Sequence, residues 1–161
     1  MHAPAQIDPH QLSDYLAAMS RAALEPGLNW EVVEKKWPGI MEAFDGFDVM
    51  TVADYGPEDV ERLMGDARII RNRRKVDAII HNAGEILALE KTTPGGFVGY
   101  LRSIPTYPAL VADMKKRFKF LGDSGIYHFL YVVREPVPDW DSWMKDHPGS
   151  NATKKWSHGG R

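Results

Sequence analysis

Apolar side chains recur along this chain at intervals of three and four residues, the spacing of a helix face, and no stretch shows sustained two-residue alternation. The first apolar stripe predicts a helix over residues 9–24, because Asp8 and Pro9 supply an N-cap and a proline at the first helical position. A second stripe predicts a helix over residues 30–44, and Pro38 inside it is expected to break or kink that helix.

A longer helix is predicted over residues 73–89, where apolar side chains cover a face broad enough for a central, largely buried position. Shorter helices are bounded by glycine and proline, and we expect them over residues 57–64, 96–102, 107–116, 123–133 and 139–145, with one helical turn at 51–55. The pattern therefore predicts an all-α protein, with a single helical domain over residues 1–146 and a flexible C-terminal tail over residues 147–161.

Basic residues concentrate in two short clusters, at residues 68–75 and 115–119, which hold nine of the twenty Lys and Arg. The clusters coincide with two hinges between predicted helices, over residues 67–72 and 118–122. The net charge of −2 does not mark a nucleic-acid binder, but a local basic surface attracts a polyanion whatever the total charge. One cluster alone is typical of a solvated helix face, whereas two basic hinges favour a phosphate-binding surface.

The chain contains no cysteine, which excludes disulfides, thiolate catalysis and metal sites that use sulfur. No run of about eighteen apolar residues occurs, so no membrane-spanning segment and no membrane partner are expected. The N-terminal residues MHAPAQIDPHQ lack the basic start and the apolar core of a signal peptide. These features are consistent with a protein of the reducing cytoplasm.

Longer motifs resemble a known family. Residues 27–30 read GLNW, residues 58–63 read EDVERL, and residues 66–83 read DARIIRNRRKVDAIIHNA. This combination resembles DNA-3-methyladenine glycosylase I, a bacterial base-excision repair family of the helix-hairpin-helix superfamily. KKRFKFLG at residues 115–122 resembles the second signature of the family, without the glycine that the family usually has at this point.

The resemblance implies an all-α, helix-hairpin-helix glycosylase fold with two helical lobes and a DNA-facing cleft between them. The backbone of Phe120, Leu121 and Gly122 would form the hairpin that grips a DNA phosphate, together with the N-terminus of the following helix. Other phosphates would be neutralised, without sequence reading, by Arg71, Arg73, Lys75 and Lys119. We interpret His81 and Asn82, on the long helix, as packing and solvent-facing residues.

The chain departs from the family pattern at the structural zinc and in the base pocket. Family members hold zinc with Cys and His residues, whereas this chain has no Cys and only His147 and His158 near its end, so no metal and no cofactor are expected. The position of the family's base-recognising Glu is Ala22 here. Glu25, one helical turn later and in place of a family Gln, is the only nearby acid.

Base excision needs a base that is flipped from the stack, held between aromatic rings and cut at its glycosidic bond. The resemblance places the stacking Trp of the family at Trp30, and Tyr15 is a partial stand-in for an aromatic segment that this chain lacks. Methylation at adenine N3 makes the base cationic, so an aromatic pocket attracts it through cation–π contact. For Trp30 the alternative is a core tryptophan at a helix start. Glu25 is a candidate to bind the base edge, and the interpretation that we favour for it is an exposed turn acid.

Two further acids are candidates to stabilise a developing oxocarbenium ion. Members of the superfamily outside this family use an Asp that follows the hairpin, and Asp139 and Asp141 lie 17 and 19 residues beyond Gly122. Both also stand where a helix cap is expected, before Trp140 and Trp143, and we favour the cap interpretation.

The primary hypothesis is a monomeric, cytoplasmic and nucleoid-associated DNA repair enzyme, which releases 3-methyladenine-type bases from double-stranded DNA by hydrolysis of the N-glycosidic bond. A rival hypothesis is a DNA-binding module that kept the fold and lost catalysis, which Ala22 and the missing aromatic segment favour. A third is a glycosylase for a different lesion, which would explain the altered pocket equally well.

Overall fold

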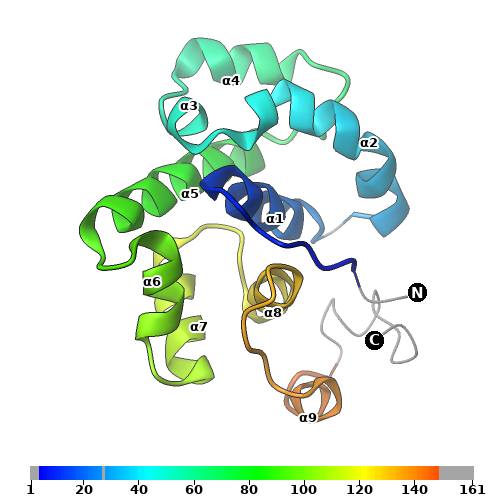
Figure 1. The fold of residues 1–161 in the computed structure, drawn as a ribbon. Helices are drawn as coiled ribbons and strands as arrows, with labels where there is room; N and C mark the ends of the chain where they lie inside the picture. The colour runs from blue at the N-terminus through cyan, green and yellow to red at the C-terminus, as the bar shows by residue number, and fades with distance from the viewer. Residues whose placement is uncertain (1–3, 27, 149–161) are drawn as a thin grey trace.

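The computed structural model describes residues 4–26 and 28–148, and the regular structure in these ranges is entirely helical, as predicted (Figure 1). Most observed bounds lie within one to three residues of the predicted ones. The elements are α1 (Leu12–Leu24), α2 (Trp30–Ala43), the 3₁₀ turn η1 (Asp45–Phe47), α3 (Val49–Ala53), α4 (Pro57–Met64), α5 (Arg73–Thr92), α6 (Gly96–Ser103), α7 (Tyr107–Arg117), α8 (Asp123–Val132) and α9 (Trp140–Asp146).

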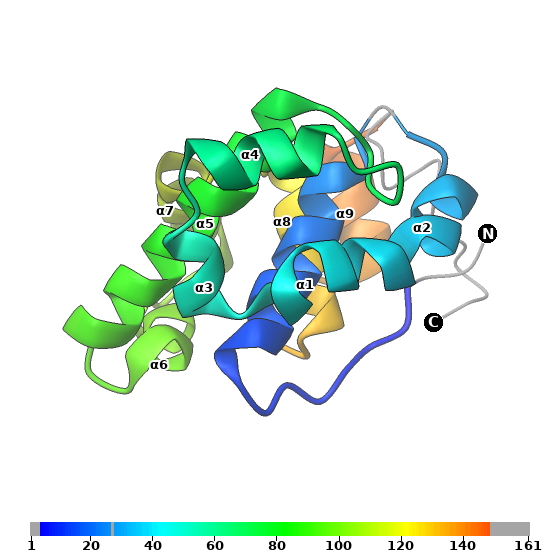
Figure 2. The same ribbon diagram turned by 90° about the horizontal axis from the view of Figure 1, so that it is seen from above.

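The long helix α5 and helix α1 lie in the middle of the molecule, between two groups of shorter helices (Figure 1). Helices α2, α3 and α4 form one group, and α6 to α9 form the other. Seen from above, α3 and α4 cover α5, while α2 lies beside α1 (Figure 2). Helix α1 also packs against α8, so it joins the two groups. This arrangement agrees with two helical lobes.

One continuous hydrophobic core runs through both groups of helices. Helix α5 supplies the centre of this core with Val76, Ile79, Ala83, Ile86 and Leu89, which recur at helical spacing on one face. A smaller cluster of Tyr127, Trp140 and Trp143 fixes α9 against α8. Among the helices described, none combines the length and the apolar character needed to cross a membrane.

Helix α2 runs without interruption through Pro38, so the predicted break does not occur. A proline inside a helix removes one backbone hydrogen bond and costs roughly 3 kcal/mol. Packing on both sides of Pro38 offsets this cost, because Val33 and Ile40 are fully buried and Trp37 stacks on Phe47 at 5.5 Å between ring centres. Tertiary contacts therefore hold both halves of α2 in one helix.

Helix α1 begins at Leu12 rather than at residue 9, and an extended arm precedes it. The Asp14 carboxylate accepts hydrogen bonds from the backbone N–H groups of His10 and Gln11, at 2.8 and 3.2 Å, and this closes the start of the helix. The arm is tied to the end of α8, where the Ile7 N–H donates to the Val132 carbonyl at 2.9 Å. Residues 4–7 consequently lie along one side of the cavity described below.

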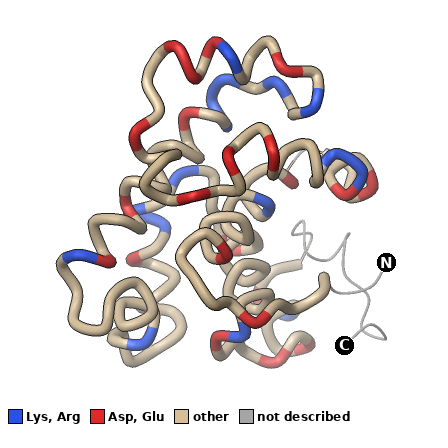
Figure 3. Tube along the Cα trace, turned by 45° about the horizontal axis from the view of Figure 1, so that its top comes forward, with Lys and Arg blue, Asp and Glu red and all other residues tan. Residues whose placement is uncertain are grey.

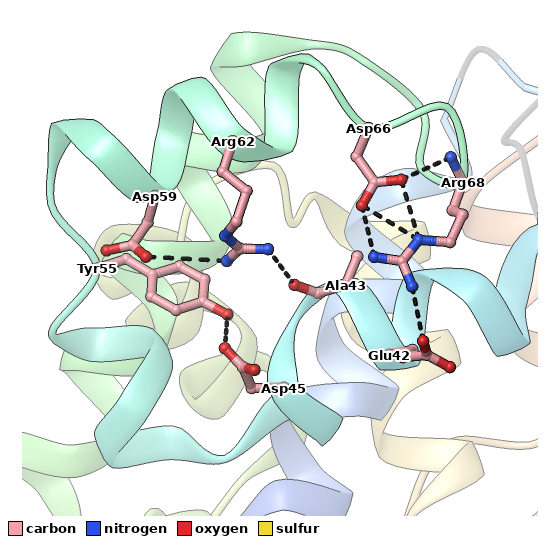
Figure 4. Close-up of polar contacts among 8 residues, drawn as sticks. All are labelled: Glu42, Ala43, Asp45, Tyr55, Asp59, Arg62, Asp66 and Arg68. Carbon is pink, nitrogen blue, oxygen red and sulfur yellow. Dashed lines mark hydrogen bonds and ion pairs between the residues drawn. The ribbon is translucent and has the colours of Figure 1, made fainter.

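Ion pairs and hydrogen bonds fix the hinge before α5 onto the end of α2 (Figure 4). The Arg68 guanidinium donates to Asp66 Oδ2 at 2.7 Å and to Glu42 Oε1 at 2.9 Å. In α4, the Arg62 guanidinium donates to the Ala43 carbonyl at the end of α2, at 3.0 Å. Arg68, although part of the first basic cluster, thus has a structural role. Acidic and basic residues are interspersed along the chain rather than separated onto two faces (Figure 3).

Candidate functional site

A cavity of about 620 Å³ lies between α1, α2 and α8, with the N-terminal arm along one side. Its volume is within the range typical of small-ligand sites, and a purine base would fit in it. Helices α1 and α2 each present one face to it. The lining residues are Pro4, Ala5, Ile7, Asp14, Ala17, Ala18, Arg21, Trp30, Glu34, Trp37, Met41, His128 and Val132.

Two tryptophans and one arginine form the α2 side of the cavity. Trp30 and Trp37 both line it, and the Arg21 guanidinium lies 5.2 Å from the Trp30 ring centre and 5.1 Å from the Trp37 ring centre. Both distances are within cation–π range. Arg21 also pairs with Glu34. Trp30 therefore lies where a base pocket was predicted, but a cation already covers part of its ring.

The predicted acid Glu25 is buried and pairs with a histidine that the sequence did not single out. Glu25 ends α1 with 2% of its surface exposed, and its Oε1 lies 3.4 Å from Nδ1 of His128 in α8. The His128 ring lies 5.9 Å from the Trp30 ring, centre to centre. The interpretation of Glu25 as an exposed turn acid is wrong, because the contact between α1 and α8 encloses this carboxylate.

Lys75 was predicted to bind DNA, but its side chain points into the interior. It is 7% exposed, and its Nζ donates to the carbonyl groups of Leu24 at 2.9 Å and Pro26 at 2.8 Å. These two carbonyls flank Glu25 in the turn between α1 and α2. These contacts hold the turn in place. Because its side chain is buried, Lys75 is not part of the DNA surface proposed below.

Three other predicted residues do not line the cavity. Tyr15 packs its ring edge-on against Phe97, 5.4 Å between ring centres, because it lies on the face of α1 that meets the core rather than on the face of Asp14 and Arg21. Asp139 caps α9, where its Oδ2 accepts from the Ser142 N–H at 3.2 Å. Asp141 lies in the first turn of the same helix and is exposed.

The second hinge is held to α5 by a residue whose role the sequence analysis missed. Asn82 is 1% exposed; its Nδ2 donates to the Lys119 carbonyl at 3.0 Å, and its Oδ1 accepts from the Lys119 N–H at 2.8 Å. The solvent-facing interpretation of Asn82 is wrong. Its position three residues after Ile79, on the apolar face of α5, was the available signal, because a buried amide requires polar partners.

The first turn of α5 and the second hinge meet on one surface through Arg74 and Phe120. Phe120 has a left-handed φ of 59° and is 38% exposed, and the Arg74 guanidinium lies 5.9 Å from the centre of its ring. With Lys119, these residues border a hollow of about 520 Å³ that also touches α5. Gly122 caps α8, so the first amides of α8 begin beside this hollow, whereas the Leu121 side chain is buried.

The other predicted cations lie at the end of the first hinge and at the start of α5. Arg71 is exposed just before α5. Arg73 is also exposed, and its guanidinium pairs with Glu61 of α4 at 2.7 Å. Arg71, Arg74 and Lys119 therefore carry the local positive charge that the two basic hinges were predicted to supply, and Arg73 is partly neutralised.

Comparison with known proteins gives the family. Methyladenine glycosylases match the chain over residues 7–119. The chain belongs to the methyladenine glycosylase family. It is 38% identical to DNA-3-methyladenine glycosylase 1 of Escherichia coli K12, over 66% of this chain and 67% of that protein. It is 34% identical to DNA-3-methyladenine glycosylase of Haemophilus influenzae, over 66% and 68%.

Solved structures of 3-methyladenine DNA glycosylase I have the same fold as this methyladenine glycosylase family member. One of them, in complex with 3-methyladenine, superposes with a TM-score of 0.70 at 25% identity, over 80% of each chain. A solution structure matches with a TM-score of 0.65 at 32% identity, over 81% of this chain and 79% of that one. The matched region of the family ends at residue 119, so His128 lies beyond it.

The side chains present do not fit the zinc site that the family resemblance implies. In the described part of the chain, no three His, Asp or Glu side chains come together as metal ligands. His147 stacks on Trp143 at 4.0 Å between ring centres and lies 3.5 Å from the Asp123 carboxylate, which is a single acidic neighbour. His158 lies outside the described residues. No step of the chemistry below uses a metal.

Proposed function

We propose that this protein is a base-excision repair glycosylase that releases 3-methyladenine-type bases from DNA. The observation that carries the proposal is the cavity walled by Trp30, with His128 and the buried Glu25 behind it, in a chain of the methyladenine glycosylase family. Its relatives are named for the release of this base, and a structure of one is a complex with it.

The cavity suits a cationic, labile leaving group. A base methylated at N3 carries positive charge while it is attached to the sugar. As water attacks C1′, the electron pair of the N-glycosidic bond passes to the base, which leaves as a neutral molecule, and the water loses a proton to solvent. An aromatic wall at Trp30 attracts the cation, and the carboxylates of Asp14 and Glu34 at the cavity add to the attraction. Strong acid catalysis is unnecessary for such a leaving group, which accounts for Ala22 in the place of a carboxylate.

The pocket must rearrange when a base enters. Arg21 covers part of the Trp30 ring, so a base stacked on that face displaces its guanidinium. The Glu34 partner at the cavity supplies a place for the displaced cation. Moving the Arg21 guanidinium off the Trp30 ring therefore costs free energy each time a base enters.

The DNA backbone would bind at the surface formed by Arg71, Arg74, Lys119 and Phe120. Its cations neutralise phosphates, and the first amides of α8 offer hydrogen bonds to one of them. The partner is double-stranded DNA with alkylated bases. The protein acts on it as a monomer, in the bacterial cytoplasm and at the nucleoid.

A second candidate function is a DNA-binding module without catalysis. It is favoured by Arg21, whose charge opposes a cationic base beside Trp30, and by the methyl group of Ala22. The same two residues also favour a glycosylase for a different, uncharged lesion.

Base release from N-methylated duplex DNA separates these functions. We expect wild-type protein to release 3-methyladenine faster than spontaneous loss, and Trp30→Ala to reduce the rate at least tenfold without weakening DNA binding. Met50→Leu, a conservative change at an exposed residue outside the cavity, is the control and should retain the rate. DNA binding without release would support the binding module, and release of another base instead would support the different lesion.

A further inference from the structure

A buried carboxylate–imidazole pair lies behind the tryptophan of the cavity. Glu25 and His128 are 2% and 6% exposed, and Oε1 of Glu25 lies 3.4 Å from Nδ1 of His128. The pair joins the end of α1 to the second turn of α8. Burial of a carboxylate is costly unless it is paired, so this contact is a strong constraint on the orientation of both side chains.

Glu25 is positioned by its own turn. Lys75 donates to the carbonyls on either side of it, Leu24 and Pro26, at 2.9 and 2.8 Å. The buried ammonium group of Lys75, which comes from α5, thus binds the backbone on both sides of Glu25. The backbone that carries Glu25 is therefore fixed, and so is the direction from which it meets His128.

The imidazole, and not the carboxylate, reaches the cavity. His128 lines the cavity and lies 5.9 Å from the Trp30 ring, whereas Glu25 does not line it. Among the other polar lining residues, the Asp14 carboxylate closes the start of α1, and Arg21 pairs with Glu34. A flat molecule that enters beside Trp30 therefore meets an imidazole whose other side is held by a carboxylate.

We propose that His128 reads the edge of the flipped base and that Glu25 is the positioning residue behind it; this inference rests on the proposed function. Because the Glu25 carboxylate lies 3.4 Å from Nδ1, we assign the ring proton of His128 to Nδ1 and the lone pair to Nε2. Nε2 then accepts a hydrogen bond from the exocyclic amino group of an adenine-type base. The pair selects 6-aminopurines over purines without that group.

Binding of free bases to the whole protein tests this inference. The probes are 3-methyladenine and 3-methylpurine, which lacks the amino group, and calorimetry gives the ratio of their affinities. We expect wild-type protein to prefer 3-methyladenine by about tenfold, the size of one buried hydrogen bond. His128→Leu should reduce the ratio to about one, and His128→Gln, which keeps an acceptor, should retain most of it.

Two more variants separate positioning from stability. Glu25→Leu should lower the ratio with His128 in place, while Met50→Leu, at an exposed methionine of α3 outside the cavity, should leave it unchanged. Because the readout is a ratio between two ligands, a general loss of folded protein does not move it. If His128→Leu is too unstable to bind either base, wild-type protein decides alone: the imidazole NMR signals of His128 must shift with 3-methyladenine more than with 3-methylpurine.

The outcomes for this inference and for the proposed function are distinct. An equal affinity of wild-type protein for the two bases, or an unchanged ratio in His128→Leu, overturns the inference even if methylated DNA is processed. A tenfold preference that depends on His128, without release of base from DNA, overturns the proposed function and leaves the inference standing.

Discussion

The side-chain amide of Asn82 pairs with the backbone of Lys119 in both directions, as donor to its carbonyl at 3.0 Å and as acceptor from its N–H at 2.8 Å. One step earlier on α5, the His81 ring lies 2.8 Å from the Arg117 carbonyl. The central helix thus holds the hinge between α7 and α8 in place. The exposed Phe120 and the start of α8 owe their positions to this support.

Replacing Asn82 should destabilise the protein and loosen this hinge. Asn82→Ala leaves a buried backbone donor and acceptor without partners, and we expect the free energy of unfolding to fall by about 2–4 kcal/mol. Urea unfolding measures the change. His81→Ala is the matched control, because His81 is exposed and makes one such contact, and its loss should be below about 1 kcal/mol. Equal losses in the two variants would contradict the assigned role of Asn82.

The joint surface of the first turn of α5 and the second hinge predicts a specific salt dependence of DNA binding. Each phosphate contact adds about 0.9 to the slope of log affinity against log salt concentration. Arg74→Ala with Lys119→Ala should therefore make the slope shallower by about 1.8. Lys91→Ala, an exposed cation at the opposite end of α5, is the control and should leave it unchanged. Fluorescence anisotropy at several salt concentrations gives the slopes. Equal slopes for wild-type protein and for the double variant at Arg74 and Lys119 would argue against this surface.

Lys75 should behave differently from its basic neighbours. Its ammonium group holds the carbonyls of Leu24 and Pro26, so Lys75→Met should lower the free energy of unfolding by about 2–4 kcal/mol. The salt slope of DNA binding should stay at the wild-type value, and base release should fall because the turn that carries Glu25 loosens. A shallower slope without any loss of stability would instead make Lys75 a phosphate contact.

The contact between Asp66 and Arg68 predicts a loss of stability in acid (Figure 4). Hydrogen bonds from Arg68 lower the pKa of Asp66 from 3.8 to about 2. Because the folded-state pKa lies below the unfolded value, the stabilisation is present above pH 3.8 and is lost as the pH falls through about 2. Asp66→Asn should therefore be less stable than wild type near neutral pH and equally stable near pH 2.

Urea unfolding of wild-type protein and Asp66→Asn between pH 7 and pH 2 measures this convergence. Glu58→Gln removes a carboxylate from the exposed start of α4 and controls for the change in net charge. A stability difference for Asp66→Asn that stays constant over the whole range would show that Arg68 does not depress the pKa of Asp66.

Helix positions were predictable from the sequence because their signals are local. Pro57 and Thr106 mark the starts of α4 and α7, and Gly122 precedes α8, so caps and apolar spacing place these helices within one or two residues. Pro38 was misjudged for the opposite reason. Its helix persists because Trp37 stacks on Phe47, a contact that becomes visible only when η1 is folded against α2.

Among the predicted pocket residues, only the one that rests on the family resemblance lines the cavity. Trp30 lies on the cavity as the resemblance implied, whereas Lys75 and Tyr15 turn into the interior. Sequence reasoning treats a lysine as exposed, and the two carbonyls that bury Lys75 are about fifty residues away along the chain. His128 gave no signal, because a histidine in an apolar helix is usually a core residue and its partner Glu25 belongs to another helix.

If the cavity beside Trp30 binds the methylated adenine during its release, the rate of base release must depend on that tryptophan. The measurement is single-turnover release of 3-methyladenine from methylated duplex DNA, quantified by chromatography, for wild-type protein, Trp30→Ala and the control Met50→Leu. We expect release above the spontaneous rate for wild type and Met50→Leu, and a rate at least tenfold lower for Trp30→Ala. Wild-type release at the spontaneous rate, or an unchanged rate in Trp30→Ala, would contradict this role of the cavity.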